Sequence, residues 1–119
     1  MLDRAERLQR QFFQIAPSTA AKPVWEPPVD VIETNKEVAI VVALPGVEPS
    51  QIEVMIEGNV LRVSGVRVLP VSLPKGAIHR LEIPRGRFER QIGLKWSHLR
   101  LNRREMLNGC LLLLFEKGA

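Results

Sequence analysis

The side chains able to do acid–base or nucleophilic chemistry are few in this chain. There are two histidines, His79 and His98, two aspartates, Asp3 and Asp30, and a single cysteine, Cys110. General acid–base catalysis needs a titratable group held beside a partner, and none of these residues lies in a motif such as HExxH, GxSxG or a glycine-rich phosphate loop. We therefore predict that the protein is not an enzyme, although a triad assembled only in space stays open.

Metal and disulfide chemistry have no better support in the sequence. A single cysteine forms no internal disulfide, and the chain contains neither a CxxC motif nor a Cys/His cluster with the spacing of a zinc site. Cys110 stands in an apolar run, where a thiol is most simply a small core residue. We predict no catalytic residue, no metal and no cofactor.

Charge and hydropathy patterns address the remaining broad classes of partner. The formal net charge is +4, and basic residues gather between residues 85 and 104, interleaved with acidic residues such as Glu89 and Glu105. No RNA-binding or helix-turn-helix signature accompanies them. The charged start of the chain lacks the apolar region of a secretory signal, and no apolar run approaches the ~18 residues of a membrane span. We predict a cytoplasmic protein that binds neither nucleic acid nor a membrane.

Arg90 is the most informative charged residue. In Phe88-x-Arg90-x-Ile92-x-Leu94 it shares its alternation with three apolar residues, so a regular strand directs it inward. A guanidinium stays protonated, and burying it without a partner is very costly. Arg90 is therefore either a strand-end residue that reaches water or an interface residue paired with a carboxylate. Our hypothesis is the paired interface arginine.

Two strand-like stretches are apolar on both faces. Between residues 38 and 44, one face is aliphatic and the other consists of Ala39, Val41 and Ala43; residues 110–115 alternate in the same way. Antiparallel sheets in small proteins normally bury one face and wet the other. The second face must then be covered by the protein's own loops or by another chain. We predict an exposed apolar groove beside these strands, lined by Val38, Ile40, Val42, Leu44, Leu111, Leu113 and Phe115.

Short strands carry these residues. Asn35-Lys36, Gly58-Asn59 and Asn108-Gly109 are hairpin-turn signals. A series of short strands separated by such turns indicates an all-β fold, an antiparallel β-sandwich. The predicted strands span residues 29–34, 37–44, 51–57, 60–65, 78–83, 88–94 and 110–115, with a loop over 66–77 and an irregular basic segment over 96–107.

A short helical arm is predicted before the sandwich. In residues 1–16, Ala5, Leu8, Phe12 and Ile15 recur at the spacing of an amphipathic helix. Four prolines between residues 17 and 28 predict a semi-extended linker. The predicted organisation is an arm and linker over 1–24, a sandwich domain over 25–117 and a truncated end over 118–119. We expect the arm to contact its own oligomer or client proteins through Leu8, Phe12, Phe13 and Ile15.

An ordered series of motifs runs through residues 25–117. Each motif is weak alone, whereas their order is specific. They are Trp25-x-Pro27-x-Val29-Asp30-Val31, Leu44-Pro45-Gly46-Val47, Asn59-x-Leu61-x-Val63-x-Gly65-x-Arg67, His79-Arg80-x-Glu82, Gly86-x-Phe88-x-Arg90 and Asn108-Gly109-x-Leu111. On these residues the chain resembles the α-crystallin domain of small heat-shock proteins, the bacterial and plant type in particular.

The resemblance implies an immunoglobulin-like sandwich and a homodimer, which higher oligomers extend. Dimers of the family exchange a strand carried in the loop, here 66–77, against the partner's edge near residues 25–31. The chain departs from the family pattern at Lys95, Arg104 and Cys110, where proline, alanine and valine are usual. The dimer interface implied by the resemblance comprises Trp25, Val29, Val31, Val68, Val71 and Arg90.

Two functions follow from the resemblance and stay open at this point. The first is a stress-response chaperone, an ATP-independent holdase that binds apolar segments of partly unfolded proteins and limits their aggregation. The second is a non-holding adaptor, similar to a co-chaperone, that binds one dedicated protein partner. A further hypothesis concerns the loop: Leu69, Val71 and Leu73 alternate as a groove plug would, so the loop would occupy a groove of its own chain or of a neighbour.

Overall fold

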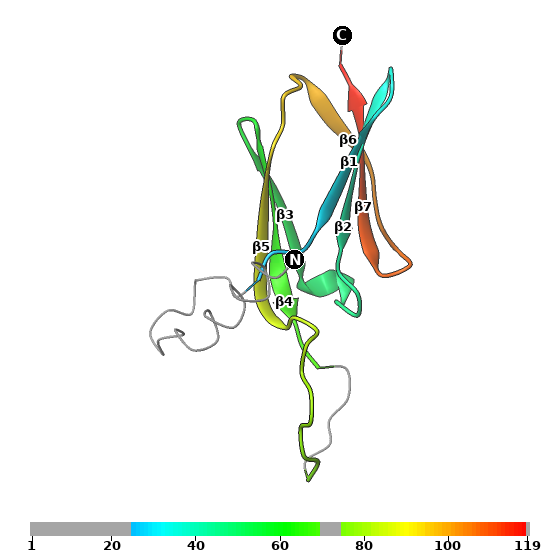
Figure 1. The fold of residues 1–119 in the computed structure, drawn as a ribbon. Coiled ribbons are helices and arrows are strands. Elements are labelled where there is room, and N and C mark those ends of the chain that lie inside the picture. The colour runs from blue at the N-terminus through cyan, green and yellow to red at the C-terminus, as the bar shows by residue number, and fades with distance from the viewer. Residues whose placement is uncertain (1–24, 70–74, 119) are drawn as a thin grey trace.

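The computed structural model describes residues 25–69 and 75–118 and shows two antiparallel sheets packed face to face (Figure 1). The predicted all-β sandwich is thereby confirmed. The predicted helical arm, with Leu8, Phe12, Phe13 and Ile15, and the loop residues Val71 and Leu73 lie outside the described residues.

Seven strands make up the sandwich in the described part of the chain. The larger sheet has the order β1-β2-β7-β6 and the smaller sheet the order β3-β4-β5, and a 3-10 helix η1 (Pro49–Gln51) leads into β3. The strands are β1 (Val29–Glu33), β2 (Glu37–Ala43), β3 (Ile52–Glu57), β4 (Val60–Arg67), β5 (Gly86–Gly93), β6 (Leu99–Leu107) and β7 (Cys110–Lys117).

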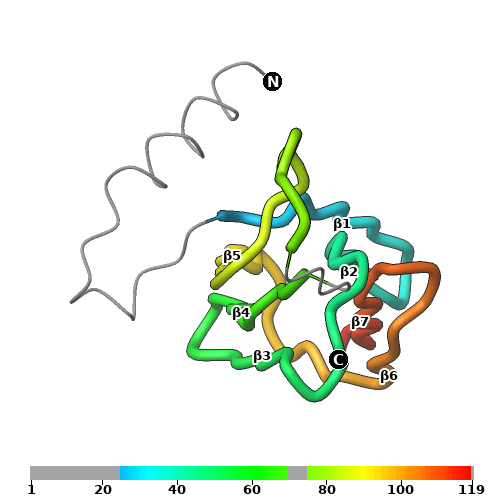
Figure 2. Tube along the Cα trace, turned by 90° about the horizontal axis from the view of Figure 1, so that it is seen from below, coloured from blue at the N-terminus to red at the C-terminus, as the bar shows by residue number. Residues whose placement is uncertain are grey.

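The two sheets leave two open sides between them. Seen from below, β5 lies toward β1 on one side, and β3 lies toward β6 on the other (Figure 2). Trp25 forms an isolated bridge with Phe88 of β5, which brings the segment before β1 against the smaller sheet. The edge strands of the two sheets therefore face each other in pairs across these open sides.

Tight turns at the predicted positions set the registers of two hairpins. Gly58 has a φ of 60°, and the turn between β6 and β7 has a φ of 51° at Asn108 and 77° at Gly109. Asn and Gly are the residues that accept this left-handed backbone most readily. The registers that follow place Glu57 opposite Val60 in the β3–β4 hairpin and Leu107 opposite Cys110 in the β6–β7 hairpin.

Two segments differ from the sequence prediction. The segment predicted as irregular contains β6, whose pairing with β7 shifts between Leu101 and Arg103. This bulge breaks the alternation of side chains, so the strand pattern is not visible in the sequence. Conversely, residues 78–83 form no strand, because no neighbouring strand of the protomer pairs with them.

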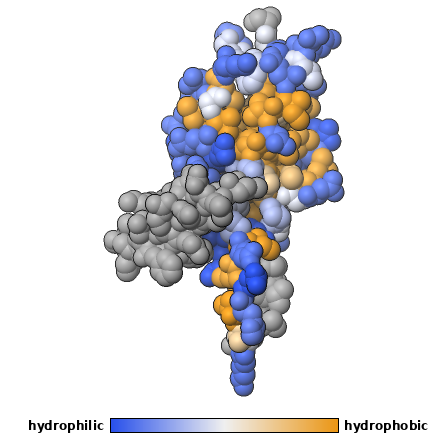
Figure 3. Space-filling view, in the orientation of Figure 1, coloured by the Kyte–Doolittle hydropathy of each residue, from blue (hydrophilic) through white to orange (hydrophobic). Residues whose placement is uncertain are grey.

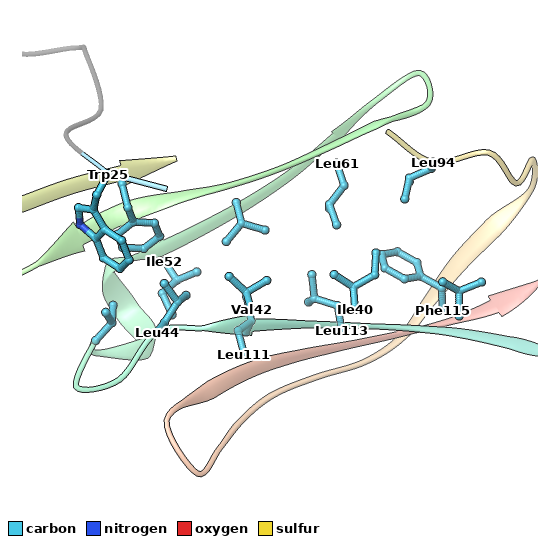
Figure 4. Close-up of a cluster of buried hydrophobic side chains, with 14 residues drawn as sticks. Trp25, Ile40, Val42, Leu44, Ile52, Leu61, Leu94, Leu111, Leu113 and Phe115 are labelled. Carbon is cyan, nitrogen blue, oxygen red and sulfur yellow. The ribbon is translucent and has the colours of Figure 1, made fainter. Parts of the chain in front are cut away.

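The core is mostly aliphatic, with a few aromatic side chains, and lies between the sheets. Phe88 and Leu61 of the smaller sheet and Ile40 of the larger sheet are all 0% exposed. Figure 4 shows side chains of β2 and β7 pointing toward Leu61 and Leu94 across the space between the sheets. Phe88 also packs on Trp25, with ring centroids 5.4 Å apart.

Candidate functional site

The seven side chains predicted to line an exposed groove form the core of the sandwich. Their exposed fractions are 0% to 1%. The strand alternation was read correctly, but the face assigned to the groove is the one that packs against the smaller sheet. The prediction of an open groove lined by these residues is therefore wrong for this protomer. They are Val38, Ile40, Val42, Leu44, Leu111, Leu113 and Phe115.

The accessible apolar surface of these strands lies on their opposite face, which points away from the smaller sheet. In register, Ile32 of β1 lies opposite Ala39 of β2, which lies opposite Leu114 of β7. Ile32 is 55% exposed, whereas the β2 and β7 residues are half-buried. We call this surface the outer apolar face and define it by Ile32, Ala39, Val41, Ala43, Leu112 and Leu114. In the view of Figure 3, apolar residues gather over the part of the body where β1 and β2 lie.

A second apolar surface lies on the segment between β4 and β5. Its described part extends beyond the ends of these strands, away from the sandwich (Figure 1). Ile78, Ile83 and Val68 are 72%, 62% and 65% exposed. Bulky aliphatic side chains at such exposures are unusual away from binding surfaces when they gather in one segment.

The residues predicted for a dimer interface fall into two groups. Trp25 is only 5% exposed, and its Nε1 donates a hydrogen bond to the Gly86 carbonyl oxygen at 3.2 Å. Val29 is half-buried beside the core, whereas Val31 on the edge strand β1 is 44% exposed. Trp25 and Val29 thus stabilise the protomer itself, and Val31 and Val68 remain accessible to a second chain.

Arg90 does not lie at a strand end, so that alternative is wrong, whereas a carboxylate partner at an interface stays a prediction. It lies in the middle of β5, opposite the buried Val63, with its side chain in the inward phase as predicted. Its Nη1 donates a hydrogen bond to the Pro27 carbonyl oxygen at 3.3 Å, and no carboxylate pairs with it within the described residues. Arg90 therefore bridges the open side between β5 and the segment before β1.

Two further arginines bridge other parts of the sandwich in the same way. On the opposite open side, Arg104 of the edge strand β6 is exposed, although it lies opposite the buried Leu113, and its Nη2 donates to the Ile52 carbonyl oxygen of β3 at 2.9 Å. Arg67 is 7% exposed and donates to the carbonyl oxygens of Pro45 and Pro84, at 2.6 and 2.9 Å. Sequence reasoning missed both roles. The one signal in the sequence was that Arg67 and Pro45 both belong to the ordered series of motifs, Arg67 as the last residue of one motif and Pro45 within another.

Arg104 narrows the space between β3 and β6. A small pocket of about 80 Å³ remains there, lined by Ile52, Arg104 and Met106 together with Pro49, Glu105 and Leu111. The guanidinium lies against the free backbone edge of β3, which belongs to the other sheet. This edge is therefore partly closed by a side chain of the protomer.

Replacing Arg90 tests its role as a bridge. Arg90→Ala removes the hydrogen bond to Pro27 and leaves the carbonyl oxygen of this buried residue without it. We expect the free energy of unfolding to fall by about 1–2 kcal/mol, since such a bond from a charged donor contributes at this scale. Thermal unfolding and solution mass measure the effect. Unchanged melting temperature and unchanged assembly size would show that the arginine carries neither role.

A cluster of polar contacts around the Glu33 carboxylate joins the ends of β1 and β7. Glu33 accepts hydrogen bonds from Lys117 Nζ at 2.5 Å and from Trp96 Nε1 at 2.9 Å. These donors, the Lys117 bond first, hold the pKa of the Glu33 carboxyl below its usual range. The cluster is a surface contact between three segments that are distant in the sequence.

The described part of the chain contains neither a candidate metal site nor a candidate membrane-spanning helix. Within residues 25–69 and 75–118, histidine, cysteine and acidic side chains form no group of three or more that would hold a metal ion. Over the same residues, the chain has no helix with the length and apolarity to cross a bilayer. The candidate binding surfaces are therefore the outer apolar face and the exposed aliphatic side chains of the segment between β4 and β5.

Comparisons with solved structures give the fold's relatives. The hspA protein of Xanthomonas axonopodis is 29% identical, with a TM-score of 0.68 over 78% of this chain and 94% of that chain. Heat shock protein 16.0 of Schizosaccharomyces pombe is 26% identical, with a TM-score of 0.66 over 77% and 86%. A small heat-shock protein of Xylella fastidiosa is 26% identical, with a TM-score of 0.65 over 80% and 88%.

Sequence comparison identifies the family. A search of curated proteins finds no match. The model of the Hsp20/alpha crystallin family matches residues 30–117, which include all seven strands but for the first residue of β1. The two-sheet topology and the ordered motifs lie in the same span. The chain therefore belongs to the Hsp20/alpha crystallin family, the small heat shock proteins.

Proposed function

We propose that the protein is an ATP-independent holdase that binds apolar segments of partly unfolded proteins and limits their aggregation. The observation that carries the proposal is the outer apolar face, an antiparallel sheet face that is aliphatic where water normally selects polar side chains. Membership of the small heat shock proteins supports a chaperone role. We further propose that the protein acts in the cytoplasm and without catalysis or cofactors.

The energy available from such a face suits reversible binding. Covering ~400 Å² of apolar surface contributes roughly 10 kcal/mol at about 25 cal/mol per Å². Association entropy and side-chain ordering offset much of this gain. The net binding free energy is then only part of this gain. Binding of this strength holds an unfolded client protein reversibly and needs no energy source for its release.

Suppression of aggregation tests the proposal. The full chain is mixed at near-stoichiometric amounts with several unrelated proteins that aggregate on heating, and light scattering is followed. We expect suppression for most of them. Activity toward none would instead favour the adaptor that binds one dedicated partner, and would contradict the holdase.

A pair of variants locates the activity on the sheet. Ile32→Asp places a carboxylate on the outer apolar face, and we expect it to raise the amount of protein needed for suppression several-fold. Met55→Asp is the matched control, because Met55 is a similarly exposed apolar residue, at 47% against 55%, on the smaller sheet. Equal effects of both variants would show that the outer apolar face is not the holding surface.

We also propose that the protein forms a homodimer in which the segment between β4 and β5 pairs with β1 of a second chain. β1 is an edge strand with free backbone groups and exposed side chains, such as Val31. The projecting segment supplies exposed aliphatic side chains of the kind that would cover that edge. The high-order structure named for the Xylella fastidiosa relative supports assembly in this family.

Solution mass tests the assembly. Ile83→Asp places a charge on the projecting segment, where Ile83 is 62% exposed, and we expect it to shift the protein toward monomer. Met55→Asp again serves as control and should leave the mass unchanged. A wild-type protein that is monomeric at micromolar concentration, or an Ile83→Asp variant of unchanged mass, would contradict this arrangement.

A further inference from the structure

We propose that the N-terminal arm, residues 1–16, docks on the outer apolar face of its own chain. The occupant is inferred from three properties of the face: the sizes of its side chains, its two carboxylates without an ion pair among the described residues, and its distance from the point where the arm joins the sandwich. The inference goes beyond the holding of clients, because it assigns the face an occupant within the protein.

The face combines short and bulky apolar side chains in register. Its middle strand, β2, contributes the small residues Ala39 and Ala43 with Val41 between them. The neighbouring strands contribute Ile32 on one side and Leu112 and Leu114 on the other. Along β2 the side chains are thus shorter than those of Ile32, Leu112 and Leu114 on either side. The arm's predicted apolar stripe, with Leu8, Phe12 and Ile15, carries bulky side chains that would pack over the shorter ones.

The charge around the face is asymmetric. On the β6 side, Arg103 pairs with Glu105, and Arg100 Nη2 lies 2.5 Å from Glu116 Oε1. On the β1 and β2 side, the carboxylates of Asp30 and Glu37 form no ion pair within the described residues. These two carboxylates are therefore available to a cationic side chain of another segment.

The arm carries the opposite charge. Residues 1–16 contain three arginines, Arg4, Arg7 and Arg10, against the two acids Asp3 and Glu6. An arm with bulky apolar side chains for the short residues of β2 and arginines for Asp30 and Glu37 matches both properties of the face. Opposite charges at the rim fix orientation and partner choice more than affinity.

The connection to the sandwich is short enough for docking within one chain. The Pro28 carbonyl oxygen accepts a hydrogen bond from the Ala43 N–H at 3.0 Å, so the chain passes one end of the face as it enters β1. The residues between Ile15 and Trp25 span up to about 30 Å at ~3.3 Å per residue. β2, with its 7 residues, is about 23 Å long at the same rise. The arm can therefore reach the whole face from its own attachment point.

Cys110 is a native reporter of docking. It is the single cysteine of the chain, is half-buried and lies directly opposite Ala43 at one end of the face. In the full chain we expect Phe12→Asp to speed the reaction of Cys110 with a maleimide several-fold, with an unchanged melting temperature. Gln14→Asp introduces the same charge on the opposite side of the predicted helix and should leave the rate unchanged. Equal labelling rates in wild type and Phe12→Asp would overturn the proposal.

Cross-linking tests the same contact and its source. Leu8→Cys, Phe12→Cys and Ile15→Cys each add one thiol to the arm, and diamide serves as the oxidant. We expect at least one of them to form a disulfide with Cys110 within a single chain, seen as a faster-moving monomer on a non-reducing gel. A disulfide only between two chains, or none in all three variants, would overturn the proposal. Neither readout depends on clients, so failure here is distinct from failure of the holding function.

Discussion

Gly65→Ala is expected to lower the free energy of unfolding by about 3 kcal/mol or more, the upper end of overpacking costs. Gly65 lies in β4 with its inward position opposite Ile52 and Phe88. A Cβ at this residue would overlap the Gln51 carbonyl oxygen and would lie 2.8 Å from Phe88 Cζ. One obstacle is backbone and the other is a ring in the core, so neither moves without cost. Urea unfolding followed by Trp fluorescence measures the loss.

Gly93→Ala is the matched control for this prediction. Gly93 is also a strand glycine, at the end of β5, but a Cβ there would have no atom within 4 Å. Its free energy of unfolding should change by less than about 1 kcal/mol, because alanine also lowers the entropy of the unfolded chain. Comparable losses in both variants would mean that the loss of glycine itself, and not the contact with Gln51 and Phe88, sets the cost.

Arg67→Met is expected to lower the free energy of unfolding by about 3 kcal/mol, given the usual contribution of hydrogen bonds from charged groups. The buried guanidinium donates to the Pro45 and Pro84 carbonyl oxygens, at 2.6 and 2.9 Å. Methionine keeps the apolar stem and leaves both oxygens without these donors. Because Pro84 closes the projecting segment, limited proteolysis between residues 75 and 85 should also become faster.

Arg62→Met provides the comparison. Arg62 is on the same strand as Arg67, but its Nη2 pairs with the exposed Glu57 carboxylate at 2.6 Å. Exposed ion pairs contribute about 0–1 kcal/mol, so this variant should lose less than about 1 kcal/mol. If Arg67→Met lost no more than Arg62→Met, the carbonyl contacts of Arg67 would not be stabilising.

The hairpin signals and alternation predicted most of the fold. Asn108-Gly109 and Gly58-Asn59 lie at turns as expected, because left-handed backbone selects these residues locally. β6 was missed for the opposite reason: its bulge near Leu101 changes the phase of the strand, and a bulge depends on the partner strand. The predicted strand over 78–83 failed because a strand needs a neighbour to pair with.

The candidate site was predicted in type but not in place. Two apolar faces on β2 were recognised from alternation, yet alternation alone does not say which face the second sheet covers. Burial shows that the phase of Ile40 is fully covered, whereas the phase of Val41 is only half-buried. The bridges made by Arg67 and Arg104 were beyond sequence reasoning, because their acceptors are backbone carbonyl oxygens. Any residue supplies such an oxygen, so no residue type marks the position.

The use of carbonyl oxygens as acceptors has a consequence for acid tolerance. Arg67, Arg90 and Arg104 join the two layers through groups that keep their charge state in mildly acidic solution. The Glu33 contact behaves otherwise: its lowered pKa means that its stabilisation is present above the unfolded pKa and is lost as pH falls through the folded pKa. Acidification should thus loosen the junction of β1 and β7 first, while the two layers stay joined.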